Sequence, residues 1–473
     1  MKKVKIIPAI MAVTVSLIMA LTGCSDSGTT SNTGDISGET GTSVTLNSDD
    51  MFTNRDFETG FDESTATKIT ISDSNSNTSI TKEGTYIISG STSDGSITVD
   101  VDDTEKVQLV LNGVSVTSKT SAALYVKSAD KVFVTTVKGT ENTLANGGTF
   151  TAIDDNKIDG AVYSKDDITF NGEGTLTVIS PAAHGIVGKD DVKFTSGTYK
   201  IDCKSHGVDA NDSIRVANAN VTITAGKDGL HCDNDEDTEK GFIYIESGTF
   251  NIDVDDDGIH AITTLQINSG TFTVKAAEGL EATVIIINDG TISIEASDDG
   301  INAAKKSTIS TPTVQINGGK ITIVMGKGDT DGIDSNGDII INGGTIDITG
   351  NSSFDYDGKG VLNGGTVIVN GEEVTTLPNQ FAGGGGGMGG PGGMGGNGNA
   401  PGGMRGRPGD NNADTITSAT PNANGERPEM PNFNGDNSQR PEKPEFDGSN
   451  DAGGNRQKPS GKAGSKNSTQ NNA

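Results

Sequence analysis

The sequence is poor in the side chains that build several common kinds of site. Its 473 residues include no tryptophan, six tyrosines, three cysteines and four histidines. Neutral glycans are usually bound by stacking sugar rings on aromatic side chains, so this scarcity argues against that mode of recognition. The chain also lacks a nucleophile motif, a glycine-rich phosphate loop and a His-Glu-x-x-His motif. Cys203 and Cys232 occupy different places in the pattern described below, so we expect them to fill small core spaces rather than to pair.

Positive charge is also scarce, with 35 lysines and arginines against 64 aspartates and glutamates and a net charge of −29. The three lysines near the start contribute +3, and the charges of residues 381–473 cancel. Residues 25–380 therefore carry −32. Such a charge argues against nucleic acid or an anionic lipid surface as a direct partner. It favours cations, or anions that are reached through cations.

Only one long apolar run is present. It extends over residues 6–21, follows three lysines and ends at Leu21-Thr22-Gly23-Cys24. The run is shorter than the roughly 20 residues of a membrane span, which disfavours a transmembrane anchor. It resembles a bacterial lipoprotein signal, so we expect residues 1–24 to be a signal peptide and Cys24 to become the lipidated first residue. The lipid would hold the protein at the extracellular face of the cell membrane.

Composition divides the rest of the chain into three parts. Residues 25–60 are expected to be a flexible spacer, and residues 61–380 carry the alternating apolar pattern of strands. From Phe381 onward glycine, proline and asparagine dominate and apolar residues are few. A segment of that kind cannot bury enough surface to offset its chain entropy. We therefore predict a disordered tail over residues 381–473.

A repeat of 21 or 22 residues runs through the third part, with longer units where loops are inserted. Each unit has an acid or histidine followed by glycine, then three short strand patterns such as GIHA, TLQIN and TFTVKA. Leucine-rich repeats and calcium-binding β-rolls are disfavoured because their Leu-x-x-Leu-x-Leu and Gly-Gly-x-Gly-x-Asp motifs are missing. Three strands that cannot close a core alone, repeated at constant length, predict an all-β fold, a right-handed parallel β-helix.

Stacked coils place equivalent residues about 4.8 Å apart, in columns. The residue before each corner glycine forms a column that we call the corner column: Asp159, His184, His206, Asp228, Asp257, Glu278, Asp299, Asp331 and Asp357. Two residues after the glycine lies the following column: Asp209, His231, His260, Glu281, Asn302 and Asp334. Further acids stand just upstream of the corners, as at Asp256 and Asp298.

Two carboxylates at this spacing repel each other by roughly 1 kcal/mol in water and by about 3 to 4 kcal/mol at an effective dielectric constant near 20. A whole column of them needs a compensating charge. Calcium accepts six to eight oxygen ligands in flexible geometry, so it is the expected cofactor. The competing interpretation is that the acids face solvent and keep the sheet edge from aggregating. The predicted calcium ligands are Asp209, Asp228, Asp233, Asp235, Asp256, Asp257, Glu278, Asp298, Asp299, Asp331 and Asp334.

Two of these ligands belong to an insertion, DNDEDTEKGFIY, that superficially resembles an EF-hand loop. Thr238 replaces the glycine of the sixth position and Tyr244 replaces the closing glutamate, so a calcium site there would be of another type. The four histidines fall in or near the columns and are able to share a transition metal. We favour their interpretation as hydrogen-bonding members of the columns.

The Asp-Gly-Ile/Leu corners, the Ile-Asn-Gly-Gly-Thr turns and the lipoprotein start resemble a family of bacterial surface β-helix proteins, the calcium-dependent carbohydrate-binding domains. The resemblance covers about residues 60–375 and implies binding of acidic plant sugars such as polygalacturonate, and of cellulose. The family is similar in fold to the family 9 polysaccharide lyases, whose calcium motif is Asp-Asp-Gly-x-Asp and whose base is a lysine. Asp256-Asp257-Gly258 and Asp298-Asp299-Gly300 match its start, but His260 and Asn302 stand at its last position, while Asp331-Gly332-Ile333-Asp334 keeps the last Asp after Thr330.

We therefore expect a non-catalytic, monomeric surface lipoprotein that binds acidic polysaccharide through calcium and contacts the membrane only through its lipid. A calcium-dependent pectate lyase is the enzymatic alternative, with Lys275, Lys305 or Lys306 as the base. A structural surface protein or adhesin with a protein partner is the third.

Overall fold

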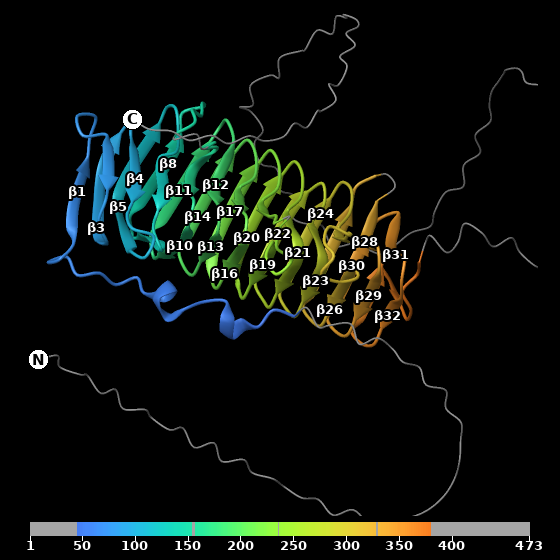
Figure 1. Ribbon diagram of the computed structural model, residues 1–473. Coiled ribbons are helices and arrows are strands. Elements are labelled where there is room, and N and C mark those ends of the chain that lie inside the picture. Colours follow the sequence, from blue (N-terminus) through green and yellow to red (C-terminus); the bar gives the residue numbers. More distant parts are fainter. Residues whose placement is uncertain (1–44, 154–156, 235, 328–329, 380–473) are drawn as a thin grey trace, which may run out of the picture. The chain divides into compact units, whose positions relative to one another are not determined.

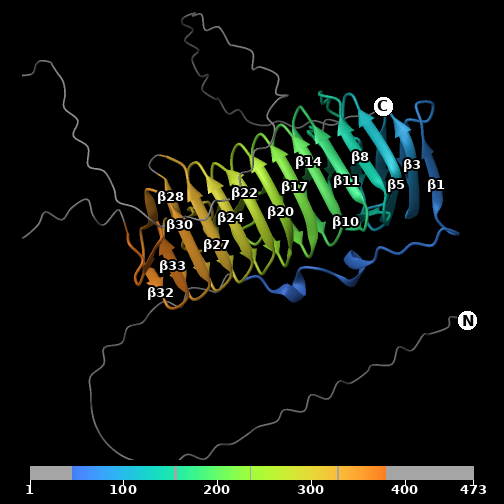
Figure 2. The same ribbon diagram turned by 180° about the vertical axis from the view of Figure 1, so that it is seen from behind.

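The computed structural model describes residues 45–379, except 154–156, 235 and 328–329. In this part the chain forms 34 strands, two short 3-10 helices and no α-helix. Figures 1 and 2 show the strands side by side in rows. The all-β class is thus confirmed. The expected signal peptide with Cys24 and the expected tail over 381–473 lie outside the described residues. Within the described residues, no helix is long and apolar enough to span a membrane.

The strands pair in three parallel ladders. The first contains β1 (Thr67–Ile71), β3 (Gly84–Thr92), β5 (Lys106–Ser118), β7 (Lys131–Thr136), β10 (Asp167–Gly172), β13 (Asp191–Phe194), β16 (Ser213–Val216), β19 (Phe242–Ile245), β21 (Ile259–Ile267), β23 (Leu280–Ile287), β26 (Thr313–Ile316), β29 (Asp338–Ile341) and β32 (Gly360–Leu362). The second contains β8 (Glu141–Asn146), β11 (Thr175–Ser180), β14 (Thr198–Cys203), β17 (Ala219–Ala225), β20 (Gly248–Val254), β22 (Thr271–Ala276), β24 (Thr291–Ala296), β27 (Lys320–Met325), β30 (Thr345–Thr349) and β33 (Thr366–Val369).

The third ladder contains β2 (Asn77–Ile80), β4 (Ser96–Asp100), β6 (Leu124–Ser128), β9 (Gly160–Ser164), β12 (His184–Gly188), β15 (Val208–Ala210), β18 (Leu230–Cys232), β25 (Ile301–Ala303), β28 (Asp331–Ser335) and β31 (Ser352–Tyr356). The long strands β21 and β23 take part in both the third and the first ladder. Among the described residues, the antiparallel exceptions are β34 (Glu372–Val374) on β33 and one isolated bridge. The chain visits the third, first and second ladders in turn, and we call one such passage a coil.

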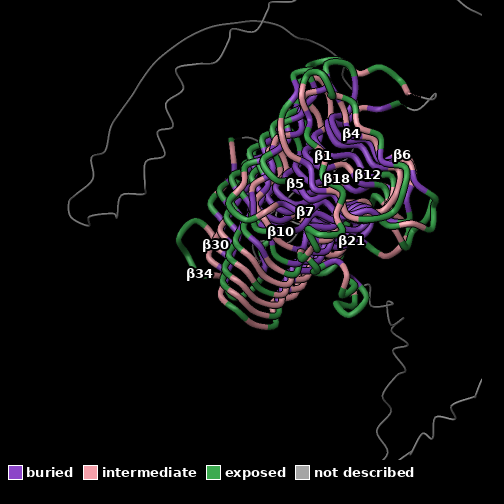
Figure 3. The backbone as a smooth tube through the Cα atoms, turned by 90° about the vertical axis from the view of Figure 1, so that its left-hand side faces the viewer, coloured by how far each residue is buried: buried purple, intermediate pink, exposed green. Residues whose placement is uncertain are grey.

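Alternation of side chains fixes which face of each strand is buried. In β22 the chain buries Phe272 and Val274 and exposes Thr271, Thr273 and Lys275. Register then stacks like on like, because Phe272 pairs with Phe250 of the preceding coil and their rings lie parallel, 4.6 Å apart. Burying each such side chain stabilises the fold by about 1.5 to 3 kcal/mol. Figure 3 shows the buried residues gathered on the inner side of the winding chain.

Residues 45–58, which we call the strap, differ from the flexible spacer expected over 25–60. They include the two 3-10 helices, Ser48–Asp50 and Asn54–Phe57, and Figure 1 shows them running across the strands. Met51 is buried against Phe242 and Tyr244 of β19. The backbone N–H of Leu46 donates to the side chain of Gln266 at 2.8 Å. Packing against coils far along the chain therefore orders this part of the predicted spacer.

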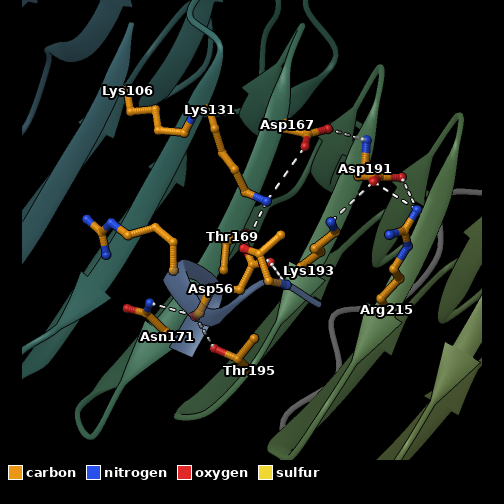
Figure 4. A network of polar contacts seen from close by, with 12 residues as sticks. Asp56, Lys106, Lys131, Asp167, Thr169, Asn171, Asp191, Lys193, Thr195 and Arg215 are labelled. Atoms are coloured by element: carbon orange, nitrogen blue, oxygen red, sulfur yellow. Dashed lines mark hydrogen bonds and ion pairs between the residues drawn. The ribbon is translucent and has the colours of Figure 1, made fainter. Parts of the chain in front are cut away.

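The strap is fixed most firmly at Asp56, whose side chain is fully buried. Its carboxylate lies 2.7 Å from the Lys131 ammonium and accepts a hydrogen bond from the Thr169 hydroxyl at 2.9 Å. Its backbone carbonyl accepts from Asn171 and Thr195 (Figure 4). Burial opposes the charge, but Lys131 and the backbone N–H of Thr53 outweigh it and lower the pKa of Asp56 to about 2. This acid is buried with its own cation.

Candidate metal centre

The acid-glycine corners lie where the second ladder ends and the third begins. Their backbones are joined from coil to coil, because the N–H of Gly229 donates to the carbonyl of Asp257 at 2.9 Å. The N–H of Gly258 likewise donates to the carbonyl of Glu278 at 2.8 Å. Successive corner acids are therefore held one strand spacing apart, as the repeat predicts.

Close approach explains why glycine follows the acid. A Cβ atom at Gly258 would lie 2.4 Å from a methyl carbon of Val274 and 2.5 Å from the backbone oxygen of Gly279. Neither neighbour can move freely, because one is core and the other is the next corner. The glycine lets the chain turn tightly against the core, and the turn presents the preceding acid at the edge of the coil.

The following column has the register that the sequence predicts. Strand pairing places its members opposite one another in the order Asp209, His231, His260, Glu281, Asn302 and Asp334. The column continues to Asp355, which pairs with Asp334. Val187 stands opposite Asp209 at the other end, so the polar part of the column begins there.

Two members of the predicted corner column are wrong. Asp331 pairs with Ser352, so Ser352 and not Asp357 occupies the corner position of the last coil. Alignment on the Asp-Gly pair misled the prediction there, because that coil has serine at its corner. At the other end His184 pairs with Gly160, which places Asp159 one residue out of register. The column therefore extends from His184 to Asp331 and then to Ser352.

Seven side chains of the two columns converge at the middle coils: His206, Asp228, His231, Asp257, His260, Glu278 and Glu281. We call them the corner cluster. They form three groups whose ligand atoms lie within 4.8 Å of one another: His206, Asp228 and His231; Asp228, Asp257 and His260; Asp257, Glu278 and Glu281. They line a cleft of about 400 Å³ together with Lys227, Asp256 and Lys306. The cluster thus joins strong metal-ligand atoms to an open groove.

At the carboxylate end of the corner cluster, burial disfavours the ionised forms of Glu278 and Glu281. Burial, with the charges of Glu281 and Asp257, raises the pKa of Glu278 to about 8. Burial also raises the pKa of Glu281, against the opposing effects of His260 and Lys306. Asn302 donates to Glu278 at 3.0 Å, but its own buried Oδ1 atom has no hydrogen-bond partner. Among the described residues, Glu278 forms no ion pair with a lysine, arginine or histidine, although Lys306 and His260 contact the neighbouring Glu281.

The histidine end is better compensated. His231 Nδ1 lies 2.7 Å from Asp209, and His206 Nδ1 lies 3.0 Å from Asp228. Burial opposes the charge of both aspartates, but the imidazoles outweigh it and lower both pKa values. Burial similarly disfavours the charged form of His260, but contacts of 3.0 Å to Asp257 and 3.2 Å to Glu281 outweigh it and raise the pKa of this imidazole.

The acids of the last coils form a separate set. Burial and the neighbouring carboxylates raise the pKa of Asp299 to about 6 and that of Asp334 to about 7. Asp331 accepts a hydrogen bond from the Ser352 hydroxyl, and its N–H donates to Asp299 at 2.9 Å. Over the described ranges, none of the three groups within 4.8 Å includes these acids. They are stacked, but farther apart than the corner cluster.

The remaining predicted ligands are scattered. Asp256 is exposed and lines the cleft, whereas Asp298 is exposed at the next corner but one. Asp233 lies in the insertion with a buried, unbonded Oδ1 atom, and Asp235 lies outside the described residues. Of the predicted set, the structure brings together Asp228, Asp257 and Glu278.

Sequence reasoning missed four of the seven residues as ligands: His206, His231, His260 and Glu281. All four stand in the predicted columns, so column membership was the available signal. Residue type alone could not show that the middle coils bring their ligand atoms so close.

The three candidate lysines lie in different places. Lys306 is in the cleft, where its ammonium lies 2.8 Å from Glu281. Burial lowers the pKa of Lys306, but Glu281 outweighs this effect and raises it. Lys275 is exposed on the second ladder, 3.8 Å from Asp253. Lys305 is exposed, and its backbone N–H faces the side chain of Asn336. Of the three candidate lysines, only Lys306 lines the cleft, where it is paired with Glu281.

Two known proteins are similar to parts of this chain. A solved structure described as the polysaccharide lyase-like protein from C. thermocellum, a gadolinium derivative, is 27% identical and covers 61% of this chain and 98% of its own, with a TM-score of 0.40. A protein of Acetivibrio thermocellus described as carbohydrate-binding domain-containing is 34% identical over 194 residues, which are 41% of this chain and 64% of that relative. The match thus spans just under two thirds of the relative's length.

The family model described as carbohydrate-binding domain-containing protein matches residues 74–327 and 279–379. These ranges contain the corner cluster and cover more than half of the sequence. The chain therefore belongs to the family of carbohydrate-binding domain-containing proteins.

Proposed function

We propose that this chain is a cell-surface lipoprotein that binds an acidic polysaccharide through calcium ions held at the edge of a right-handed parallel β-helix. The observation that carries the proposal is the convergence of Asp257, Glu278 and Glu281 within 4.8 Å beside an open cleft. The family suggests carbohydrate as the class of ligand, and the three carboxylates suggest that a calcium ion holds it. Right-handed coils are supported by the strong preference of parallel strand crossovers for that hand.

The donor set fits calcium. Three carboxylates offer up to six oxygens, and the unbonded Oδ1 atom of Asn302, a residue only 8% exposed, lies in the same column as Glu281. Calcium accepts six to eight oxygens from carboxylates, amide carbonyls and water. A bound ion would supply the positive charge that Glu278 lacks. Asp256, exposed at the rim of the cleft, is positioned to contribute a further oxygen.

The charge of the domain requires such a bridge. Residues 25–380 carry −32, so a polyuronate in direct contact with the corner would be repelled. A calcium ion that is only partly coordinated by the protein can accept carboxylates of the sugar. Magnesium holds its water in stricter octahedral geometry and should substitute poorly.

We propose binding without catalysis. A lyase needs a base that can take a proton near the bound uronate, and Lys306 is the candidate lysine that lines the cleft, together with Lys227. Its ion pair with Glu281 favours the protonated form, which is unsuited to a base. The enzymatic alternative predicts steady formation of unsaturated product from polygalacturonate in calcium, abolished by Lys306→Ala. A flat absorbance trace with the parent protein would exclude it.

The binding proposal is tested by retention of polygalacturonate on the immobilised mature chain, in calcium and in chelator. Asp257→Asn should weaken retention in calcium at least tenfold, although it makes the protein less negative. Asp253→Asn is the matched control, because it removes the same charge from an exposed position on the second ladder and should have no effect. Retention by Asp257→Asn that equals or exceeds that of the parent would refute calcium bridging. Failure of the parent to retain any polysaccharide would favour an adhesin with a protein partner.

The surface anchor is a separate proposal that rests on the sequence around Cys24. Cells that express the chain should show it in the membrane fraction and accessible to added protease. Cys24→Ser should release it from the membrane. A variant that stays bound would contradict lipid anchoring.

A further inference from the structure

The histidine end of the corner cluster has a different chemistry from its carboxylate end. The rings of His206 and His231 stack 4.3 Å apart at 22°, and His184 stacks on the other side of His206 at 5.1 Å. Stacking fixes the planes of the rings, and two of them then face the same carboxylate, that of Asp228. Imidazole nitrogen is a poor ligand for calcium and a good one for zinc and related ions.

His231 is oriented as a metal-ligating histidine usually is. Its Nδ1 atom is engaged by the carboxylate of Asp209 at 2.7 Å. In the neutral imidazole this contact places the proton on Nδ1 and leaves Nε2 with a free lone pair. That Nε2 atom lies 3.9 Å from Asp228 Oδ2, a separation that one ion can bridge. A carboxylate behind the histidine, opposite the ligand atom, is the typical outer shell of zinc sites.

His206 supplies an independent observation. The residue is only 9% exposed, and its Nδ1 atom is buried without a hydrogen-bond partner. That atom faces the Asp228 carboxylate, 3.0 Å from Oδ2, in an alignment too poor for a hydrogen bond, so its contact with this acid is electrostatic. Leaving a buried polar atom without a hydrogen bond destabilises the fold. A ligand that accepts the lone pair of this nitrogen would remove that destabilisation.

We propose that His206, Asp228 and His231 form a second metal site, which takes an imidazole-preferring divalent ion of the zinc class. It shares no residue with the calcium site proposed at Asp257, Glu278 and Glu281, so neither proposal depends on the other. Three protein ligands are one short of the usual four of zinc, and the cleft leaves the fourth position to water or a sugar oxygen.

The test uses the mature chain, stripped with chelator and titrated with Co²⁺, whose visible absorption reports nitrogen and oxygen ligands. We expect one ion per chain, displaced by an equal concentration of Zn²⁺ but not by the same concentration of Ca²⁺ or Mg²⁺. His206→Ala and His231→Ala should each weaken Co²⁺ binding more than tenfold. Asp209→Asn should weaken it about tenfold, because it removes only the outer-shell partner.

Two controls separate this site from its surroundings. His184→Ala removes an imidazole of the same stack that belongs to none of the three ligand groups, and Glu278→Gln alters only the oxygen site. Both should bind Co²⁺ within twofold of the parent. Circular dichroism and melting in chelator, matched to the parent, show that the variants are folded.

Co²⁺ binding that is no tighter than Ca²⁺ binding would overturn the inference. So would equal loss in His184→Ala and His231→Ala, which indicates non-specific binding by imidazoles. Asp209→Asn, whose change is nearly isosteric, keeps the test decisive if an alanine variant fails to fold, because unchanged Co²⁺ affinity in it would also contradict the proposal.

Discussion

Two carboxylates in the same stack of coils, those of Asp56 and Glu278, have pKa values that are shifted in opposite directions. Asp56 of the strap is fully buried, contacts Lys131 at 2.7 Å and has its pKa lowered to about 2. Glu278 of the corner cluster is half-buried among Glu281 and Asp257, and its pKa is raised to about 8. Asp56 has its cation, Lys131, within the chain, whereas Lys306 and His260 at the corner contact Glu281 and form no ion pair with Glu278 among the described residues. A cation from solution binds most favourably to a carboxylate whose charge no group of the chain balances.

The first prediction removes the internal cation. Lys131→Met leaves Asp56 buried without its ion pair, which should cost about 3 to 5 kcal/mol of stability, measured as a lower urea midpoint. Lys106→Met is the control, because its pair with Asp130 is exposed and should contribute less than about 1 kcal/mol. Equal losses in the two variants would mean that the strap does not depend on this pair.

The second prediction removes the external cation. Calcium that binds only the folded chain should stabilise it by about 2.7 kcal/mol at a concentration 100-fold above Kd. The melting temperature should therefore fall in chelator. In Glu278→Gln most of this difference should disappear, whereas Asp253→Asn should keep it. The same melting temperature in calcium and chelator would instead support the interpretation that the corner acids face solvent without a bound ion.

The third prediction concerns acid. The folded pKa of Asp56 lies below its ordinary 3.8, so the stability contributed by its ionised form is complete above about pH 4 and is lost as the pH falls to about 2. The shift corresponds to about 2 kcal/mol. Relative to the parent, Asp56→Asn should be less stable at pH 5, and the gap should close towards pH 2. A gap that stays constant would show that the charge of Asp56 is not what holds the strap.

The smallest effect is expected at Asp298. Its sequence context, Asp-Asp-Gly, equals that of Asp256, and both acids are exposed and outside the converged groups, but Asp256 lines the cleft and Asp298 does not. Asp298→Asn should change stability by less than about 0.5 kcal/mol and leave polygalacturonate retention unchanged. A large loss of retention would mean that corner motif, rather than convergence, defines the site.

Much of the corner could be predicted because the repeat length sets the register. Pairing of His260 with Glu281 follows from a coil of 21 residues, and pairing of His231 with His260, which lie on either side of the insertion, follows from aligning the Asp-Gly corners. Alignment on the Asp-Gly pair failed at Asp357, because a coil length of 21 residues places Ser352 opposite Asp331. Local periodicity thus predicts columns wherever the coil length is respected.

The strap could not be predicted in this way. Asp56 and Lys131 are far apart in sequence and belong to no common repeat, so no pattern joins them. The choice among the corner acids is a similar case. Glu278 differs from Asp298 in its burial and in its neighbours on adjacent coils, and side-chain packing determines both.

The most direct measurement is the affinity for polygalacturonate of the parent and of Glu278→Gln, each titrated with calcium. Above about pH 8, where the Glu278 carboxylate is ionised, removing its negative charge favours a polyanion by simple electrostatics, whereas losing a calcium ligand disfavours it, so the two mechanisms predict opposite signs. We expect Glu278→Gln to bind at least tenfold more weakly at a calcium concentration that saturates the parent, with no difference between them in chelator. Equal or tighter binding by Glu278→Gln in calcium would contradict a calcium bridge at the corner cluster.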